Sequence, residues 1–218
     1  MEIIPIEIFG IAIDVPFAGP ISYGQAQFDT FGSKICDPAK GLGVRPDQIR
    51  LRKLDDLYDY ELTGRFFGEN GTLTRTAERV KLGIRNARNA ADWNIVKETL
   101  TRFYHLMEFP EQTHTLLSTH VHAKFPSLYE RDEFLRQFEP KGEVVKPCAL
   151  GYVRIADWEK DIRILIEQSN LTPDSLFIAW DTQFANSQDW DTFLSILPTM
   201  MENSAHSFGL GFEPLKQP

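Results

Sequence analysis

Few cysteines, no long apolar run and no basic leader set the first limits on this chain of 218 residues. Its two cysteines, Cys36 and Cys148, are too few for the disulfide framework of a small secreted protein. The N-terminal segment is apolar but carries acidic residues and no basic cluster, so it is a poor secretory signal. No apolar run reaches the ~18 residues that a membrane-spanning helix needs. We therefore expect a cytoplasmic protein with no membrane partner.

The sequence also lacks the motifs of the common cofactor-dependent enzymes. It has no Gly-x-Ser-x-Gly nucleophile motif, no His-Glu-x-x-His and no paired Cys-x-x-Cys. The glycine pair Gly41 and Gly43 is too short for a dinucleotide-binding fingerprint, so Rossmann and P-loop enzymes are excluded. A net charge of -8 argues against nucleic acid as a partner. We expect no cofactor.

Two segments of the chain resemble each other at an offset of 97 residues. Residues 89–94 read Asn-Ala-Ala-Asp-Trp-Asn and residues 186–191 read Asn-Ser-Gln-Asp-Trp-Asp. The Asn suits a helix N-cap, and the apolar residues that follow recur every three or four positions, which predicts an amphipathic helix in each half. The apolar stripes are Trp93, Val96, Leu100 and Phe103, and Trp190, Phe193, Leu197 and Met200. The pattern predicts an internal duplication.

Each predicted helix follows a series of β-rich segments. They are 6–15, 49–54, 58–67 and 73–85 in the first half, and 115–125, 150–155, 161–167 and 176–184 in the second. A capping box from Ser127 to Glu130 starts a short helix after segment 115–125. The matching stretch 18–48 is rich in Gly and Pro and is expected to be mostly loop, of a length often used for binding.

The order of these elements predicts an α+β fold. We expect a duplicated, pseudo-symmetric, curved antiparallel sheet with the long helices packed on one face. Residues 1–109 would form the first β-rich repeat, ending in a helix, and residues 110–218 the second, together one compact unit. This order resembles the duplicated TATA-binding-protein-like and GyrI-like (SOUL) architectures over most of the chain. The resemblance implies a fold and no particular function.

The C-terminal part of the chain carries a second resemblance. It runs from a strand ending in Trp180 and Asp181, through Asp189 and Trp190, to a helix that closes with His206. This pattern is similar to the tail of a sporadically distributed bacterial family of uncharacterised proteins. That family implies no activity for the chain.

Residues 75–85 are the strongest candidate for a binding surface. Odd positions hold four cations and the even positions 80, 82 and 84 hold aliphatic residues, so on a strand the cations would share one face. The cations are Arg75, Arg79, Lys81 and Arg85, and Arg50, Arg52 and Arg65 on neighbouring segments would extend the same face. Such a face suits phosphate, a carboxylate ligand or an acidic partner. The alternative is a solvated face on which these arginines pair with Asp59, Glu61 and Glu78.

Three of the five histidines, His114, His120 and His122, occupy even positions near or within one predicted strand. Imidazoles at i and i+2 of a strand are a common start of a metal site, and His105 or Asp181 offers a further ligand. The alternative is ordinary hydrogen bonding on a half-exposed strand. The sequence leaves both interpretations open.

These observations favour a non-enzymatic binding or interaction protein for a small anionic ligand or a protein partner, bound on the sheet face or where the two halves meet. The predicted binding residues are Arg79, Lys81, Arg85, Arg50 and Arg52, with His120 and His122 as the opposing wall. One alternative is a metal-dependent hydrolase whose metal ligands are His114, His120 and His122. Another is a subunit of a larger bacterial assembly, since residues 110–218 carry a net charge of -7 against -1 for residues 1–109.

Overall fold

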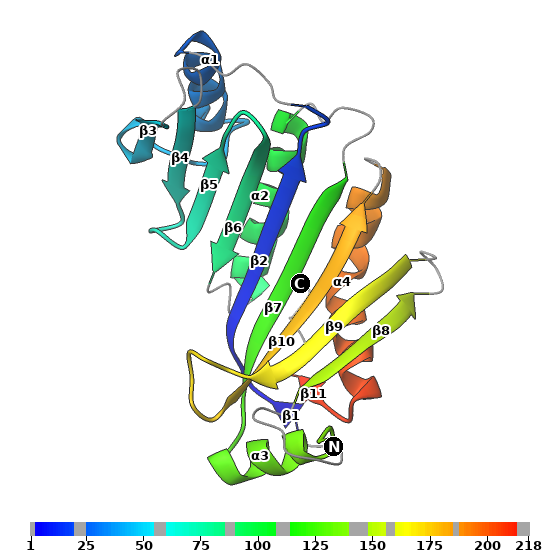
Figure 1. Cartoon of the computed structure of the whole chain (residues 1–218). Helices are drawn as coiled ribbons and strands as arrows, with labels where there is room; N and C mark the ends of the chain where they lie inside the picture. Colours follow the sequence, from blue (N-terminus) through cyan, green and yellow to red (C-terminus); the bar gives the residue numbers. More distant parts are fainter. Residues whose placement is uncertain are drawn as a thin grey trace.

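An antiparallel sheet of nine strands forms the centre of the molecule (Figure 1). The computed structural model describes residues 3–19, 25–54, 60–85, 90–107, 114–139, 148–155, 160–184 and 188–212. The strands of this sheet are β2 (Ile6–Pro16), β3 (Ile49–Lys53), β4 (Tyr60–Phe66), β5 (Gly71–Arg75), β6 (Arg79–Arg85), β7 (Thr115–Lys124), β8 (Ala149–Ile155), β9 (Lys160–Gln168) and β10 (Ser175–Phe184). The helices are α1 (Gln25–Cys36), α2 (Ala90–Met107), α3 (Leu128–Arg136) and α4 (Gln188–Ser207), and β1 (Ile3–Ile4) pairs in parallel with β11 (Gly211–Phe212).

The strand order is β3-β4-β5-β6-β2-β7-β10-β9-β8, with every neighbouring pair antiparallel. It places the first long strand of each half, β2 and β7, side by side at the centre. Each half then continues with a shorter helix, further strands and a long helix. The first half has one additional strand, β3, at the sheet edge, preceded by a 3-10 turn (Pro46–Gln48). This is the predicted α+β architecture, and one sheet runs through both halves.

The long helices α2 and α4 pack on one face of the sheet (Figure 1). Their apolar stripes are buried as predicted, with Val96, Leu100 and Phe103 on α2 facing the core, and Phe193, Leu197 and Met200 doing so on α4. The side chains of Trp93 and Trp190 and the predicted caps at 89 and 186 lie outside the described residues. None of the helices in the described ranges is both long and apolar enough to cross a membrane.

The stretch 18–48, predicted to be mostly loop, contains a helix, so that prediction was wrong. Helix α1 occupies residues 25–36 and buries Phe31 and Ile35. These residues stand one helical turn apart, and burying both on one face outweighs the flanking Gly and Pro residues. The short helix predicted after Ser127 is confirmed as α3, and the Ser127 hydroxyl accepts a hydrogen bond from the Glu130 N–H at 3.3 Å.

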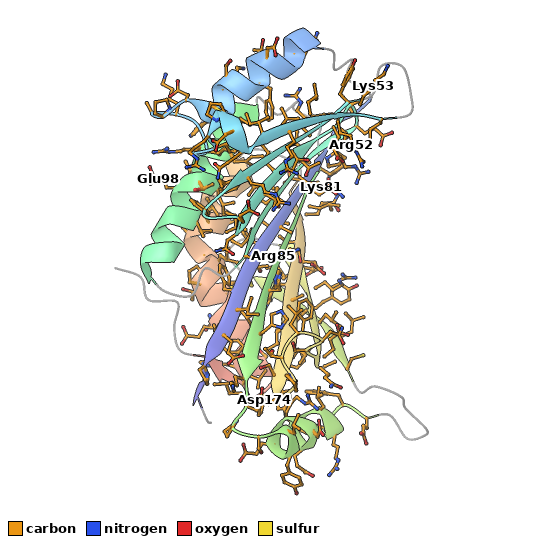
Figure 2. The ribbon with its side chains drawn as sticks, turned by 90° about the vertical axis from the view of Figure 1, so that its left-hand side faces the viewer. Arg52, Lys53, Lys81, Arg85, Glu98 and Asp174 are labelled. Atoms are coloured by element: carbon orange, nitrogen blue, oxygen red, sulfur yellow. The ribbon has the colours of Figure 1, made fainter. Side chains whose placement is uncertain are left out.

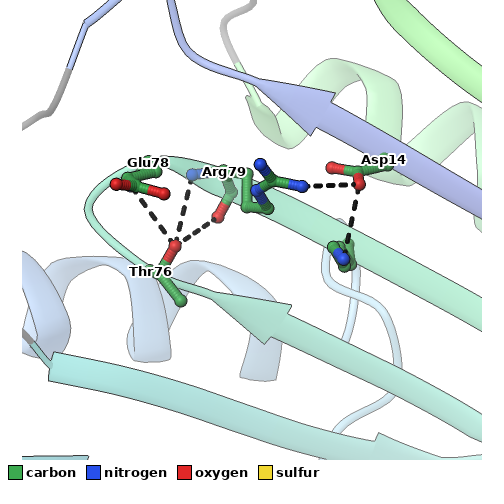
Figure 3. Close-up of polar contacts among 5 residues, drawn as sticks. Asp14, Thr76, Glu78 and Arg79 are labelled. Atoms are coloured by element: carbon green, nitrogen blue, oxygen red, sulfur yellow. Dashed lines mark hydrogen bonds and ion pairs between the residues drawn. The ribbon is translucent and has the colours of Figure 1, made fainter. Parts of the chain in front are cut away.

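The segment 73–85, predicted as one strand, is a hairpin. Strand β5 ends at Arg75 and β6 begins at Arg79. Thr76 holds the turn between them, because its Oγ1 accepts hydrogen bonds from the backbone N–H groups of Glu78 at 3.2 Å and Arg79 at 3.3 Å (Figure 3). The turn changes which of the predicted cations share a face.

Candidate ligand groove on the open face of the sheet

The face of the sheet opposite α2 and α4 is open over its central strands in the part of the chain that the structure describes. Figure 2 shows the helices on one side and the side chains of Lys81 and Arg85 extending from the other. The centre of this open face is hollowed into a groove of about 750 Å³. The groove crosses the β2–β7 pair, so both halves of the chain line it.

Three small residues form the floor of the groove. Ala12 on β2 pairs with Gly83 on β6 and with Ser118 on β7, so the three lie in one row across the sheet. Their small side chains leave the space above the strands empty. A Cβ at Gly83 would approach Thr72 Oγ1 to 3.1 Å, so even one more methyl group on the floor would crowd the wall.

Polar and apolar side chains from both halves form the walls. The first half contributes Thr72 and Thr74 of β5 and Lys81 of β6, and the second half contributes Tyr152 of β8, Asp161 and Arg163 of β9, and Asp181 and Gln183 of β10. Two large apolar side chains that line the groove are exposed: Leu116 by 46% and Tyr152 by 70%. The groove therefore offers apolar contact area beside its charges.

On the first-half side, Asp14 of β2 holds two cations of β6. Arg79 Nη1 donates to Asp14 Oδ2 at 3.1 Å, and Lys81 Nζ lies 3.4 Å from the same oxygen (Figure 3). The carboxylate is the more buried partner, with 23% of its side chain exposed against 42% for Arg79 and 53% for Lys81. The acid therefore anchors the cations from below, while their other N–H groups remain open to a ligand.

The second-half side repeats this arrangement with different residues. Arg163 of β9 donates from Nε to Asp181 Oδ2 of β10 at 3.0 Å, and the two residues are register partners. The hydrogen bond to Asp181 raises the pKa of Arg163, so this guanidinium is always charged. Half of the Arg163 side chain is exposed, against 29% for Asp181. Tyr152 pairs with Arg163 across the next strand.

Beside the groove floor, His120 of β7 leans over Gly10 of β2. The two residues are register partners, and a Cβ at position 10 would lie 2.4 Å from Cε1 and Nε2 of the imidazole. Glycine is therefore required here by the close approach of the ring. Burial, and then the neighbouring His122 and Arg85, lower the pKa of His120.

His122 is buried and is hydrogen-bonded to Ser169. Its Nδ1 lies 2.8 Å from Ser169 Oγ, which accepts hydrogen bonds from the N–H groups of Leu171 and Thr172. The Ser169 hydroxyl proton can be donated to His122 Nδ1 or to Thr172 Oγ1, which lies 3.2 Å from Ser169 Oγ. Burial lowers the pKa of His122, partly offset by the nearby Glu7. Phe177 packs against both histidines, with ring centroids 5.6 Å from His120 and 5.3 Å from His122.

Of the predicted binding residues, Lys81 lines the groove, and Arg79, Arg85, His120 and His122 lie beside it on the same face. Arg79, Lys81 and Arg85 alternate along β6 on the open face, and Arg85 is in the same register row as Gly10 and His120. Arg50 and Arg52 lie on the edge strand β3, separated from β6 by β4 and β5, and they do not line the groove. The alternative of cross-strand pairing holds for Arg52, which lies 3.6 Å from Glu61.

Arg75 is on the other face of the sheet. Because of the turn at Thr76, its register partner is the buried Val80, and its guanidinium lies 4.5 Å from the ring centroid of Phe31 on α1. The prediction that all cations at odd positions share one face was wrong for Arg75, because residues 73–85 form two strands and not one. Arg65, at the end of β4, forms an ion pair with Glu69, and Asp59 lies outside the described residues.

The three histidines of the predicted metal site do not come together. His114 precedes β7 and is exposed, and the six residues to His120 correspond to about 20 Å of strand, whereas zinc ligands lie about 2 Å from the metal. Parity places residues on a face and says nothing of their separation along it. Of the further ligands considered, Asp181 bonds to Arg163 and His105 lies on α2. Within the described ranges, no three His, Cys, Asp or Glu side chains are placed to hold a metal ion.

Sequence reasoning missed Asp14, Arg163 and Tyr152 as groove residues. The signal for Asp14 was present, since it follows Gly10 and Ala12 at the even positions of an apolar strand. The pairing of Arg163 with Asp181 depends on strand register, which the local pattern does not encode.

Comparison with known proteins adds no family to this geometry. No family model matches the chain, and no curated protein matches it. The function must therefore be argued from the groove itself.

Proposed function

We propose that the chain is a non-enzymatic binding protein for a small anionic molecule with an apolar part, held in the groove of the open sheet face. The observation that carries the proposal is the groove itself, about 750 Å³ over a floor of Ala12, Gly83 and Ser118. This volume lies within the roughly 300–1,000 Å³ of small-molecule sites in proteins. The groove spans both halves, which is where pockets commonly form.

The charges of the groove support an anionic ligand. Arg79, Lys81 and Arg163 are each more exposed than the carboxylate that holds them. At Asp14 and Asp181, a ligand entering from solvent therefore meets N–H donors before carboxylate oxygens, although Arg79 stands beside the groove lining and Asp161 is an exposed carboxylate on the wall. Each cation keeps further donors after its ion pair is made, because a guanidinium carries five N–H groups and an ammonium three.

The exposed apolar residues support a ligand with an apolar part. Leu116 and Tyr152 both line the groove and are largely exposed to solvent. Covering them would remove apolar surface from water, at about 25 cal/mol per Å² buried. An aromatic ring would also stack on Tyr152, which stands beside Arg163. The same proposal places the protein in the cytoplasm, in keeping with its two free cysteines.

Anilinonaphthalene sulfonate tests the proposal, because this dye joins an aromatic body to an anion and fluoresces when bound. We expect the folded protein to bind it, and Ala12→Phe to weaken binding at least about tenfold by filling the groove. Arg50→Phe, on the same face but at the edge strand β3, is the matched control and is expected to bind like the wild type. Near-UV circular dichroism shows that each variant is folded, which matters because the dye also binds partly folded states.

The neutral analogue N-phenylnaphthylamine separates charge from apolar contact. We expect it to bind at least about threefold more weakly than the sulfonate dye, since it cannot use the groove cations. Equal binding of the two dyes would contradict the anionic preference. Equal binding of the sulfonate dye to wild type and Ala12→Phe would contradict the groove as the site.

A further inference from the structure

Arg85, Gly10 and His120 form one row across strands β6, β2 and β7. Gly10 carries no side chain, and the Cε1–Nε2 edge of His120 extends over it, in the direction of β6. Arg85 stands at the other end of this row and is exposed. The row lies two residues along the strands from the groove floor at Ala12, which is about 7 Å. Arg85 and His120 thus flank Gly10, which has no side chain, in the row next to the groove floor.

Arg85 differs from the other cations near the groove in having no carboxylate partner among the described residues. Arg79 and Lys81 are held by Asp14, and Arg163 is held by Asp181. Arg85 forms no ion pair with a carboxylate among the residues that the structure describes. A guanidinium with its donors uncommitted is the group most suited to a phosphate, sulfonate or carboxylate.

The opposite side of the row is held in place by packing. His120 and His122 stand edge to face with ring centroids 5.9 Å apart, and Phe177 of β10 packs against both. The hydrogen bond between His122 Nδ1 and Ser169 Oγ holds the His122 ring in place. His120 is therefore a positioned group, and binding an anion there does not need to order this ring.

We infer that Arg85 and His120 form an anion subsite at the end of the groove, and that an anion bound there is accompanied by uptake of a proton on His120. This rests on the proposed function in one respect: the subsite receives the anionic group of the molecule whose apolar part fills the groove. The subsite itself recognises the charge, so an inorganic oxyanion serves as its probe.

The proton uptake follows from the charges that face His120. In the free protein, burial, and then His122 and the positive Arg85, keep the pKa of this imidazole below its ordinary value, so it is neutral at neutral pH. The other groups around it are the neutral His122 and the apolar Phe177, while Glu7 of β2 is bound to Lys124 at 3.2 Å. An anion between Arg85 and His120 cancels the repulsion and favours the imidazolium. Affinity for the anion must then rise as the pH falls.

The first experiment titrates the histidines by NMR in sodium sulfate and in sodium chloride at equal ionic strength. We expect sulfate to raise the pKa of His120 in the wild type and to leave it unchanged in Arg85→Gln. Lys81→Gln is the matched control on the same strand, and in it the sulfate effect on His120 is expected to persist. An unchanged His120 in wild-type protein, or an equal rise in Arg85→Gln, would overturn the inference.

The second experiment measures the affinity of anilinonaphthalene sulfonate between about pH 8 and about pH 5.5. We expect wild-type affinity to rise about tenfold over this range, against less than about twofold in His120→Gln. A dye that binds in the groove with no pH dependence would overturn the subsite and leave the proposed function standing. If sulfate raised the pKa of His120 and the dye did not bind, the subsite would stand and the proposed function would be overturned.

Discussion

The two faces of the central sheet are made by the same strands, yet they are built for different purposes. On β2, Phe9, Ile11, Ile13 and Val15 are buried under the helices, while Gly10, Ala12 and Asp14 lie between them on the open face. Large apolar side chains therefore pack the helix face, while small residues on the open face leave room for a groove. Because side chains alternate along a strand, one sequence can meet both demands independently. The buried core lies on the first face, and the proposed ligand groove lies on the second.

The largest expected contrast between the faces comes from one substitution made on each. Leu100 of α2 is fully buried, whereas Leu116 of β7 is 46% exposed beside the groove. We expect Leu100→Ala to lower the free energy of unfolding by about 2–5 kcal/mol, because it leaves a cavity in a close-packed core. Leu116→Ala is expected to change it by no more than about 0.5 kcal/mol. Urea denaturation followed by circular dichroism measures both.

A similar loss in the two variants would show that the open face is part of the core. The dye assay gives the complementary measurement, since of these two variants Leu116→Ala is expected to weaken binding of the sulfonate dye and folded Leu100→Ala is not.

A smaller contrast is expected from one serine on each face. Ser204 of α4 is buried, accepts the hydrogen bond of Trp180 Nε1 at 2.6 Å and donates to the Met201 carbonyl at 3.0 Å. Ser204→Ala would leave the indole N–H without a partner, at a cost of about 1–3 kcal/mol of unfolding free energy. Ser118→Ala, on the groove floor, is expected to cost no more than about 0.5 kcal/mol. Thermal unfolding of the two variants measures both losses. Equal losses of unfolding free energy would contradict the difference between the helix face and the open face.

The periodicity of the sequence was enough to predict the elements of the helix face. Spacings of three and four predicted the buried stripes of α2 and α4, and period-two alternation predicted β2 and β7. These patterns are local and reflect burial on one side, which is what the core requires. Helix α1 was missed because its buried side is marked by few large apolar residues, Phe31 and Ile35 among those whose side chains are described, within a segment rich in Gly and Pro.

The open face was less predictable because register decides it. Parity correctly put Arg79, Lys81 and Arg85 on one side of β6, and His120 and His122 on one side of β7. It did not reveal that Gly10 separates Arg85 from His120, or that Asp181 would meet Arg163, since both depend on which strands are neighbours. It also placed His114 with the other two histidines, although position along the strand separates them. Pairing between distant segments is fixed by the whole fold and not by local pattern.

The smallest expected effect is a pH dependence of stability that comes from the open face. Burial lowers the pKa of both His120 and His122 in the folded state, whereas in the unfolded chain each titrates near about 6.5. Below that pH the unfolded state binds more protons than the folded state, so stability falls as the pH is lowered from about 7 toward about 5.5. Urea denaturation at the two pH values measures this, and the double variant His120→Gln with His122→Gln is expected to lose less.

Proton linkage of stability and of anion binding should therefore have opposite signs at the same histidine. Acid favours the unfolded chain when the subsite between Arg85 and His120 is empty, and favours the complex when an anion is present. Sulfate is then expected to recover part of the stability lost at about pH 5.5 in wild-type protein, and less of it in Arg85→Gln, compared with chloride at equal ionic strength. An equal recovery in both proteins would mean that sulfate acts through general exclusion from the protein surface, with no contribution from the subsite.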